Sequence, residues 1–158
     1  MRRPWNLCDL PVHSLVTQGI DGQTNMNVCT YVSAVSMEPK IYAVAVSHGT
    51  KSLENLMKTE SAVLQILHKE QFSLVNTLGK KSGFRYNKMA YLQKKNLLEE
   101  WQERPVLKDV CARLLLRKMS YQTTGDHDLF LFSVEKYQVL SDNYLTINHL
   151  REKKIIYG

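Results

Sequence analysis

The chain has 158 residues, of which 44% are hydrophobic and 23% charged. This length and composition predict a single domain, residues 1–158, with one sizeable core. The longest hydrophobic runs, 41–46 and 129–132, are too short to span a membrane, and the N-terminus has no apolar segment of signal-peptide length. We therefore expect a cytoplasmic protein without a membrane partner.

Three cysteines, Cys8, Cys29 and Cys111, are scattered along the chain. Their odd number does not fit a disulfide framework, and their spacing does not match a zinc site. We predict structural thiols and no bound metal.

The net charge of +6 is concentrated in one part of the chain. Residues 80–118 contain eleven of the 21 lysines and arginines but only four of the 15 acids. Two interpretations stay open at this point. The local positive charge could attract nucleic acid or an anionic cofactor, or it could belong to a solvated helix face.

The first part of the chain is predicted to form strands. Alternation predicts a strand at 12–18, closed by the turn signal Asp21-Gly22, and a longer strand at 26–35. Polar residues occur on both faces of the second strand, so one face should line a wet or ligand-filled cleft. A turn containing proline then leads into a buried strand at 41–46.

A polar loop, Ser47–Ser52, separates that strand from a helix, which the spacing of Leu53 and Leu56 predicts and which should end near Thr59. The first backbone N–H groups of a helix lack internal partners and carry the positive end of its dipole. A loop of Ser, Thr, Gly, His and Lys directly before them suits an anion. The sequence therefore predicts a phosphorylated ligand here.

The remaining elements are predicted in the following order. They are a strand at 61–68, a short helix at 72–78 ended by Gly79, a basic loop at 80–87, a charged helix at 92–101, an extended segment at 105–107, strands at 111–121 and 129–139 with a turn at 123–127 between them, and a short helix or strand at 145–150.

About six strands with few, short helices favour a mainly β fold, an antiparallel barrel with helical insertions, over a doubly wound parallel sheet. The chain contains no G-x-G-x-x-G, P-loop, H-E-x-x-H or G-x-S-x-G motif. The residues alone predict a barrel with a phosphate-binding loop and do not specify a reaction.

Several segments, in the same order along the chain, resemble the flavin reductase-like family. They are LVT at 15–17, the DG at 21–22, NMNVCTYVSAVSMEP at 25–39, IYAVAVS at 41–47, HGTKSLENL at 48–56, KSGFRYNK at 81–88, RPVLKDVCARL at 104–114 and GDHDLFLF at 125–132. The resemblance covers nearly the whole chain, and it implies the FMN-binding split β-barrel fold and FMN as cofactor.

The resemblance also implies which strand residues contact the flavin. Asn27 and Thr30 would donate or accept hydrogen bonds at the isoalloxazine ring, and Val28 and Cys29 would offer backbone groups and apolar surface. Ordinary strand packing is the alternative for Cys29 and Thr30.

The phosphate of FMN is implied to bind the loop at 47–52. Lys51 would bring charge, and hydroxyl groups would come from Ser47, Thr50 and Ser52. His48 is a further candidate, with a solvent-facing position as its alternative. Lys81 and Ser82 match a loop that approaches the flavin from the partner subunit in related dimers.

His127, in the GDH turn, matches a histidine near the reactive face of the flavin. Its implied role is to position the electron donor, because hydride transfer to a flavin requires no protein acid or base. A structural hydrogen-bonding role is the alternative.

The predicted function is that of an FMN-binding, homodimeric flavin reductase-like oxidoreductase. It would accept hydride from NAD(P)H and pass electrons to free flavin, a metal chelate or a partner protein. The alternatives are an FMN electron-transfer protein without a nicotinamide site, a scaffold that has lost FMN, and a basic barrel that binds single-stranded nucleic acid through Tyr86, Tyr91 and Trp101.

Overall fold

The computed structural model describes residues 2–158. Its strands are β1 His13–Gln18, β2 Thr24–Cys29, β3 Val32–Met37, β4 Lys40–Ser47, β5 Ser61–Ile66, β6 Leu98–Trp101, β7 Arg104–Leu107, β8 Ala112–Thr123 and β9 His127–Val139. Its helices are α1 Lys51–Lys58, α2 Val75–Leu78, α3 Lys88–Lys94 and α4 Ile147–Glu152, with 3-10 turns η1 Pro4–Asn6 and η2 Lys69–Leu74. The fold is mainly β, as predicted.

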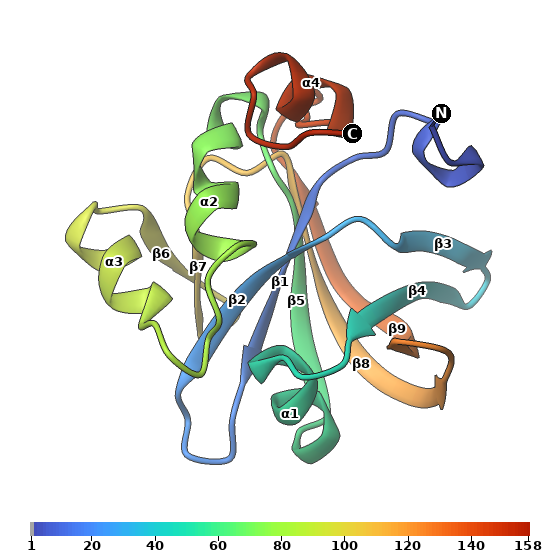
Figure 1. The fold of residues 1–158 in the computed structure, drawn as a ribbon. Coiled ribbons are helices and arrows are strands. Elements are labelled where there is room, and N and C mark those ends of the chain that lie inside the picture. The colour runs from blue at the N-terminus through green and yellow to red at the C-terminus, as the bar shows by residue number, and fades with distance from the viewer. Residues whose placement is uncertain (1) are drawn as a thin grey trace.

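Seven strands form one antiparallel sheet in the order β2-β1-β5-β8-β9-β4-β3, and β6 and β7 form a separate hairpin (Figure 1). The sheet is not closed into the predicted barrel. Strands β2 and β3 are consecutive in the chain but lie at opposite edges of the sheet. The opening between these edges is where the candidate site lies.

The chain opens this gap at Thr30 and Tyr31, in the middle of the strand predicted at 26–35. The N–H of Val32 donates to the carbonyl of Thr30 in a tight turn, and the N–H of Ala45 in β4 donates to the carbonyl of Tyr31. The single-strand prediction was therefore wrong. The backbone leaves the β1 edge after Cys29 and joins β4 at the other edge.

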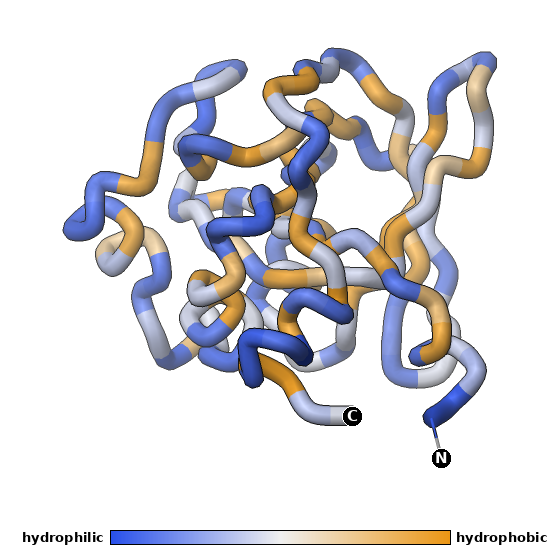
Figure 2. Tube along the Cα trace, turned by 90° about the horizontal axis from the view of Figure 1, so that it is seen from above, coloured by the Kyte–Doolittle hydropathy of each residue, from blue (hydrophilic) through white to orange (hydrophobic). Residues whose placement is uncertain are grey.

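Two hydrophobic clusters lie on the two faces of the sheet. One packs the sheet against α2, α3, α4 and the β6–β7 hairpin, with Val16, Leu78 and Leu92 among its members. The other lies inside the curved sheet under α1, with Leu56 and Phe130. In Figure 2, hydrophobic stretches run through the middle of the molecule, and the outer loops contain both hydrophilic and hydrophobic residues.

The prediction of a helix at 92–101 was also wrong. Helix α3 begins earlier, because the Asn87 side chain accepts a hydrogen bond from the N–H of Ala90 and caps it. It ends before Asn96, whose φ of 55° is left-handed. The segment from Leu98 to Trp101 then pairs with β7 as a strand.

The helix that precedes Gly79 and the loop at 80–87 were predicted correctly, as was the helix after the loop at 47–52. Within residues 2–158, no helix has the length and hydrophobicity needed to cross a membrane. The three cysteines are free thiols.

Candidate functional site

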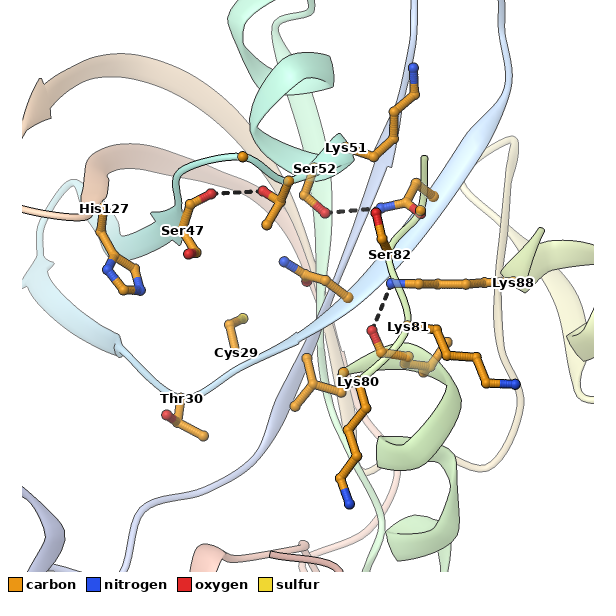
Figure 3. A pocket seen from close by; sticks show the side chains of 18 of the residues that line it. Cys29, Thr30, Ser47, Lys51, Ser52, Lys80, Lys81, Ser82, Lys88 and His127 are labelled. Atoms are coloured by element: carbon orange, nitrogen blue, oxygen red, sulfur yellow. Dashed lines mark hydrogen bonds between the residues drawn. The ribbon is translucent and has the colours of Figure 1, made fainter. Parts of the chain in front are cut away.

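A cavity of about 380 Å³ opens between the end of β2 and the start of α1 (Figure 3). Its walls come from β2 and the turn after it, the end of β4 with the loop and first turn of α1, the end of α2 with the loop that follows it, and the first residues of α3 and β9. Cavities of this size hold organic ligands in many proteins.

Strand β2 presents a free edge to this cavity. It pairs with β1 on one side only, and the carbonyl of Met26 points outward, where it accepts a hydrogen bond from Lys88 Nζ at 2.9 Å. Backbone groups of alternate residues in a strand point the same way. The backbone N–H and C=O of Val28 therefore also point away from β1, towards the cavity, and are available to a ligand.

Asn27 lies on the same strand with one polar end already committed. Its Oδ1 accepts a hydrogen bond from the N–H of Leu15 at 3.2 Å. This contact fixes the amide plane and leaves the Nδ2 donor for the cavity, which Asn27 lines. The neighbouring Cys29 thiol is held neutral, because burial raises its pKa to about 12. Cys29 therefore offers apolar surface and not a nucleophile.

The opposite wall is the first turn of α1. Gly49, with a left-handed φ of 75°, turns the chain out of β4. Thr50 then caps the helix, because its Oγ1 accepts from the N–H of Leu53 at 3.2 Å and donates to the carbonyl of Ser47 at 2.8 Å. The hydroxyl of Thr50 is thus fully used within the protein.

Ser52 occupies the second position of the same helix and is fully buried. Its Oγ accepts a hydrogen bond from Asn25 Nδ2 in β2 at 3.0 Å. The hydroxyl hydrogen stays free to donate into the cavity, beside the backbone N–H groups of Lys51 and Ser52 that begin α1 and have no partner within the helix. This turn can bind an anion without rearrangement.

The loop after α2 closes over this junction. A Cβ on Gly83 would lie 2.3 Å from Asn25 Oδ1 and 2.9 Å from Lys51 Cβ, so only glycine fits there. The Ser82 hydroxyl accepts from the N–H of Phe84 at 3.2 Å and can donate to a ligand. The loop therefore brings a hydroxyl to the same end of the cavity as Ser52.

Four lysines line the cavity, but three of them direct their charge elsewhere. The ammonium of Lys51 lies 2.5 Å from Glu54, that of Lys80 lies 2.5 Å from the carbonyl of Ile155, and that of Lys81 lies over the ring of Tyr86. Figure 3 shows these three side chains pointing outward and Lys88 pointing inward. The Lys51 ammonium, predicted to bind the phosphate, therefore lies at the rim of the cavity and not inside it.

The far end of the cavity is formed by His127 and Tyr31. His127 begins β9 directly opposite Ser47 in β4. Its Nδ1 bonds Asp126 at 2.6 Å, and its ring lies 5.3 Å from that of Tyr31. This hydrogen bond lowers the pKa of the Asp126 carboxyl. The Nε2 of His127 remains available to a ligand.

His48 is the one predicted site residue outside the cavity. Its ring Nε2 lies 2.8 Å from Asp128 Oδ1, and its backbone N–H donates to the carbonyl of Asp126. The contact with His48 lowers the pKa of the Asp128 carboxyl. His48 therefore fastens the loop between β4 and α1 to the turn before β9, from behind the site.

The sequence model of the flavin reductase like domain matches residues 8–154. The chain belongs to this family. A search of curated proteins gave no significant match. Solved structures with the same fold share little sequence with this flavin reductase-like chain, and their likeness therefore concerns the fold.

Among them, a proposed oxidoreductase from Sinorhizobium meliloti 1021 has a TM-score of 0.77 and 16% identity over 92% of this chain. The match covers 51% of that longer protein. An FMN-binding protein from Thermus thermophilus, with bound 1-cyclohex-2-enone, has a TM-score of 0.76 and 19% identity, covering 88% of this chain and 75% of its own.

A third structure is the NADH:FAD oxidoreductase from Streptomyces globisporus C-1027, in complex with NAD and FAD fragments. Its TM-score is 0.71 at 15% identity, covering 84% of this chain and 76% of that one. Proteins with this fold thus include an NADH:FAD oxidoreductase and an FMN-binding protein.

The site of this family member gathers most of the residues that the sequence singled out. Those lining the cavity are Asn27, Val28, Cys29, Thr30, Ser47, Thr50, Lys51, Ser52, Lys81, Ser82 and His127. Sequence reasoning missed Asn25, Tyr31, Lys80, Gly83 and Lys88, which line it as well. Asn25 stands at the start of the NMNVC block, and its position beside Asn27 was a usable signal.

Proposed function

We propose that this protein is an FMN-dependent oxidoreductase whose cavity holds the flavin between β2 and α1. The observation that carries the proposal is the polarity of the cavity. One end combines the N-terminus of α1 with the hydroxyls of Ser52 and Ser82, and the other combines a strand edge with His127. A flat molecule with a phosphate tail matches both ends.

At the phosphate end, the donors would be the backbone N–H groups of Lys51 and Ser52 and the Ser52 and Ser82 hydroxyls. Thr50 would act indirectly, because its hydroxyl is spent on capping α1. Ser47 adds a hydroxyl at the rim, which donates a long hydrogen bond to the carbonyl of His48 at 3.4 Å. This set of hydrogen-bond donors supports an anionic group such as a phosphate and does not suit a metal cation.

At the ring end, the backbone of Val28 and the amide of Asn27 would bind the polar edge of the isoalloxazine, and Thr30 would add a hydroxyl. The neutral Cys29 thiol would pack on the ring without reacting with it. FMN, when bound, supplies the ability to accept a hydride and release electrons singly or in pairs. The protein supplies position and control of solvent access.

His127 and Tyr31 would hold the electron donor over the exposed face of the flavin. The ring pair forms an aromatic wall at the open end of the cavity, which suits a nicotinamide. We propose NADH or NADPH as the donor and free flavin, a metal chelate or a partner protein as the acceptor. The bond from His127 to Asp126 keeps the imidazole in one orientation.

Absorbance and fluorescence titrations of the purified protein with FMN, FAD and riboflavin test flavin binding. Anaerobic addition of NADH or NADPH then tests the reductase reaction, because reduction bleaches the flavin absorbance band. Binding of FMN without bleaching by either nucleotide would favour the alternative of an electron-transfer protein reduced by another protein. Failure to bind any flavin would leave the scaffold alternative.

We also propose that the protein acts as a homodimer. Apolar side chains are exposed around an apolar hollow of about 300 Å³ beside β3 and the end of β9. They include Met37, Tyr137 and Val139, which are 88%, 61% and 72% exposed. Exposed apolar surface of this kind is typical of subunit interfaces.

The nucleic-acid alternative loses its structural support. Tyr91 and Trp101 pack against the hydrophobic core, and Tyr86 is covered by the ammonium of Lys81 at 4.0 Å. These aromatic rings do not form an exposed stacking platform.

A further inference from the structure

Lys88 differs from the other lysines of the cavity in both burial and direction. Its side chain is 5% exposed, although Lys88 is the last residue of the basic KSGFRYNK motif and the first residue of α3. Its Nζ donates to the carbonyl of Met26 at 2.9 Å and to that of Leu78 at 2.7 Å. An ammonium carries three hydrogens, so two are used and one remains.

The remaining hydrogen has no acceptor among residues 2–158, and the side chain lines the cavity. No carboxylate in this part of the chain forms an ion pair with Lys88. A buried charge without a countercharge is costly. Two neutral carbonyls offset part of that cost, and an anionic ligand would offset the rest.

The position of Lys88 identifies the part of the ligand that it would meet. Its acceptor Met26 follows Asn25, whose side chain bonds Ser52 in the first turn of α1. Its other acceptor, Leu78, precedes the loop that carries Ser82. Lys88 thus stands at the proposed anion-binding end of the cavity, and Figure 3 shows it away from His127.

We propose that Lys88 is the buried countercharge of the ligand phosphate, and that it makes the site select phosphorylated flavin over unphosphorylated flavin. This inference rests on the proposed flavin function. It assigns to Lys88 the electrostatic role that the sequence pattern suggested for Lys51. The same lysine, at the start of α3, also bonds the end of α2 and the free edge of β2. The charge of Lys88 and the position of the loop between α2 and α3 therefore depend on each other.

Proton linkage gives the proposal a second observable. Burial lowers the pKa of Lys88 to about 8. The other titratable or charged groups on the elements around it are Cys29 of β2, Lys51, Glu54 and Lys58 of α1, Lys80, Lys81, Arg85 and Tyr86 of the covering loop, and Tyr91 and Lys94 of α3. Glu54 pairs with Lys51, and α2 carries no ionisable side chain.

Binding of the phosphate must keep Lys88 protonated, so it takes up a proton above pH 8. The affinity for FMN should then fall about fivefold between pH 8 and 9, with a slope that approaches tenfold per pH unit at higher pH. The phosphate itself loses its second proton near pH 6 and is dianionic throughout this range. Riboflavin lacks the phosphate, and its affinity should change much less.

The experiment compares wild type with Lys88→Met in FMN and riboflavin titrations from pH 6.5 to 9.5. Lys94→Met, at an exposed position of the same helix, is the matched control. At pH 7, Lys88→Met should weaken FMN binding about 10- to 100-fold, change riboflavin binding less than about threefold and abolish the pH slope. Lys94→Met should behave as wild type.

Equal losses for FMN and riboflavin would overturn the proposal, because a purely structural lysine that positions the loop affects both ligands alike. An unchanged pH slope in Lys88→Met would overturn it as well. Lys88→Arg provides a second variant in which the charge is kept and cannot titrate. It should retain selectivity for FMN without the slope. If wild type binds no flavin at all, the proposed function fails first, and this outcome is distinct from the others.

Discussion

The side-chain amide of Asn25 in β2 donates to the hydroxyl of Ser52 in α1 over 3.0 Å, and both residues are buried. This one contact joins the edge strand of the sheet to the anion-binding turn of the helix. The Ser52 oxygen accepts this hydrogen bond, and its hydroxyl hydrogen is left to donate to a ligand. We therefore expect FMN binding to depend on Ser52 as a donor more than on the charge of Lys51.

This arrangement separates two residues that the sequence had grouped. Ser52→Ala should weaken FMN binding by about 1–2 kcal/mol, because a charge-assisted hydrogen bond is lost and the Asn25 amide loses its acceptor. Lys51→Ala should change the affinity less than about threefold, because its ammonium lies on Glu54 at the rim. Fluorescence titration measures both. A larger effect from Lys51→Ala than from Ser52→Ala would show that the Lys51 ammonium is the main contact of the phosphate.

His127 is expected to act on the electron donor and not on flavin binding. His127→Ala should lower kcat/KM for NADH or NADPH about tenfold and change the Kd of FMN less than about twofold. Stopped-flow reduction of the FMN-loaded protein separates the two effects. Asp126→Asn is the companion variant, since it keeps the imidazole but weakens the bond that orients it, and a smaller loss is expected. An equal loss of FMN affinity would make His127 a flavin contact.

The sequence predicted the strands and loops around the site because local chemistry decides them. Gly49 permits the left-handed turn and Thr50 caps α1, so the junction between β4 and α1 could be located within a few residues. The polarity of both faces of 26–35 indicated that one face lines a cleft, and residues 27–31 of this segment do line the cavity, whereas 32–35 belong to β3 and do not. The flavin contacts that the family resemblance implies for these residues stay a prediction.

Lys88 could not be found in this way, because its burial arises from distant residues. Its two carbonyl partners are 62 and 10 positions away in the chain, and in the sequence it is one of eleven basic residues between 80 and 118. The barrel prediction failed for a related reason. Whether β2 and β3 close the sheet depends on the two-residue turn at Thr30 and Tyr31. The alternation of apolar and polar residues continues through this turn and does not reveal it.

The apolar surface beside β3 and β9 leads to a prediction about assembly. Val139→Glu should weaken or abolish the proposed dimer, because a carboxylate would have to be desolvated at the apolar interface. Sedimentation velocity over a range of protein concentrations measures the change. Ile20→Glu, at a site 77% exposed in the turn between β1 and β2, is the control and should leave the assembly unchanged. A wild-type protein that is monomeric at all concentrations would contradict the proposal.

His13 makes the stability of the fold depend on pH. It is 4% exposed, its Nδ1 has no hydrogen-bond partner among residues 2–158, and burial lowers its pKa from 6.5 to about 4. Between these two pH values the unfolded chain binds more protons than the folded one, so the free energy of unfolding rises with pH. Above pH 6.5 the imidazole is neutral in both states and this effect is absent, whereas it destabilises the folded state by up to about 3 kcal/mol as the pH falls towards 4.

The variant His13→Leu isolates this contribution from those of other titrating groups. Urea unfolding at pH 4.5, 5.5, 6.5 and 7.5 gives the free energy of unfolding for both proteins. We expect the wild type to lose more stability than the variant between pH 6.5 and 4.5, because only the wild type must charge a buried imidazole or unfold. Parallel curves for the two proteins would show that His13 is protonated in the folded state at the same pH as in the unfolded chain, and that the core accommodates its charge.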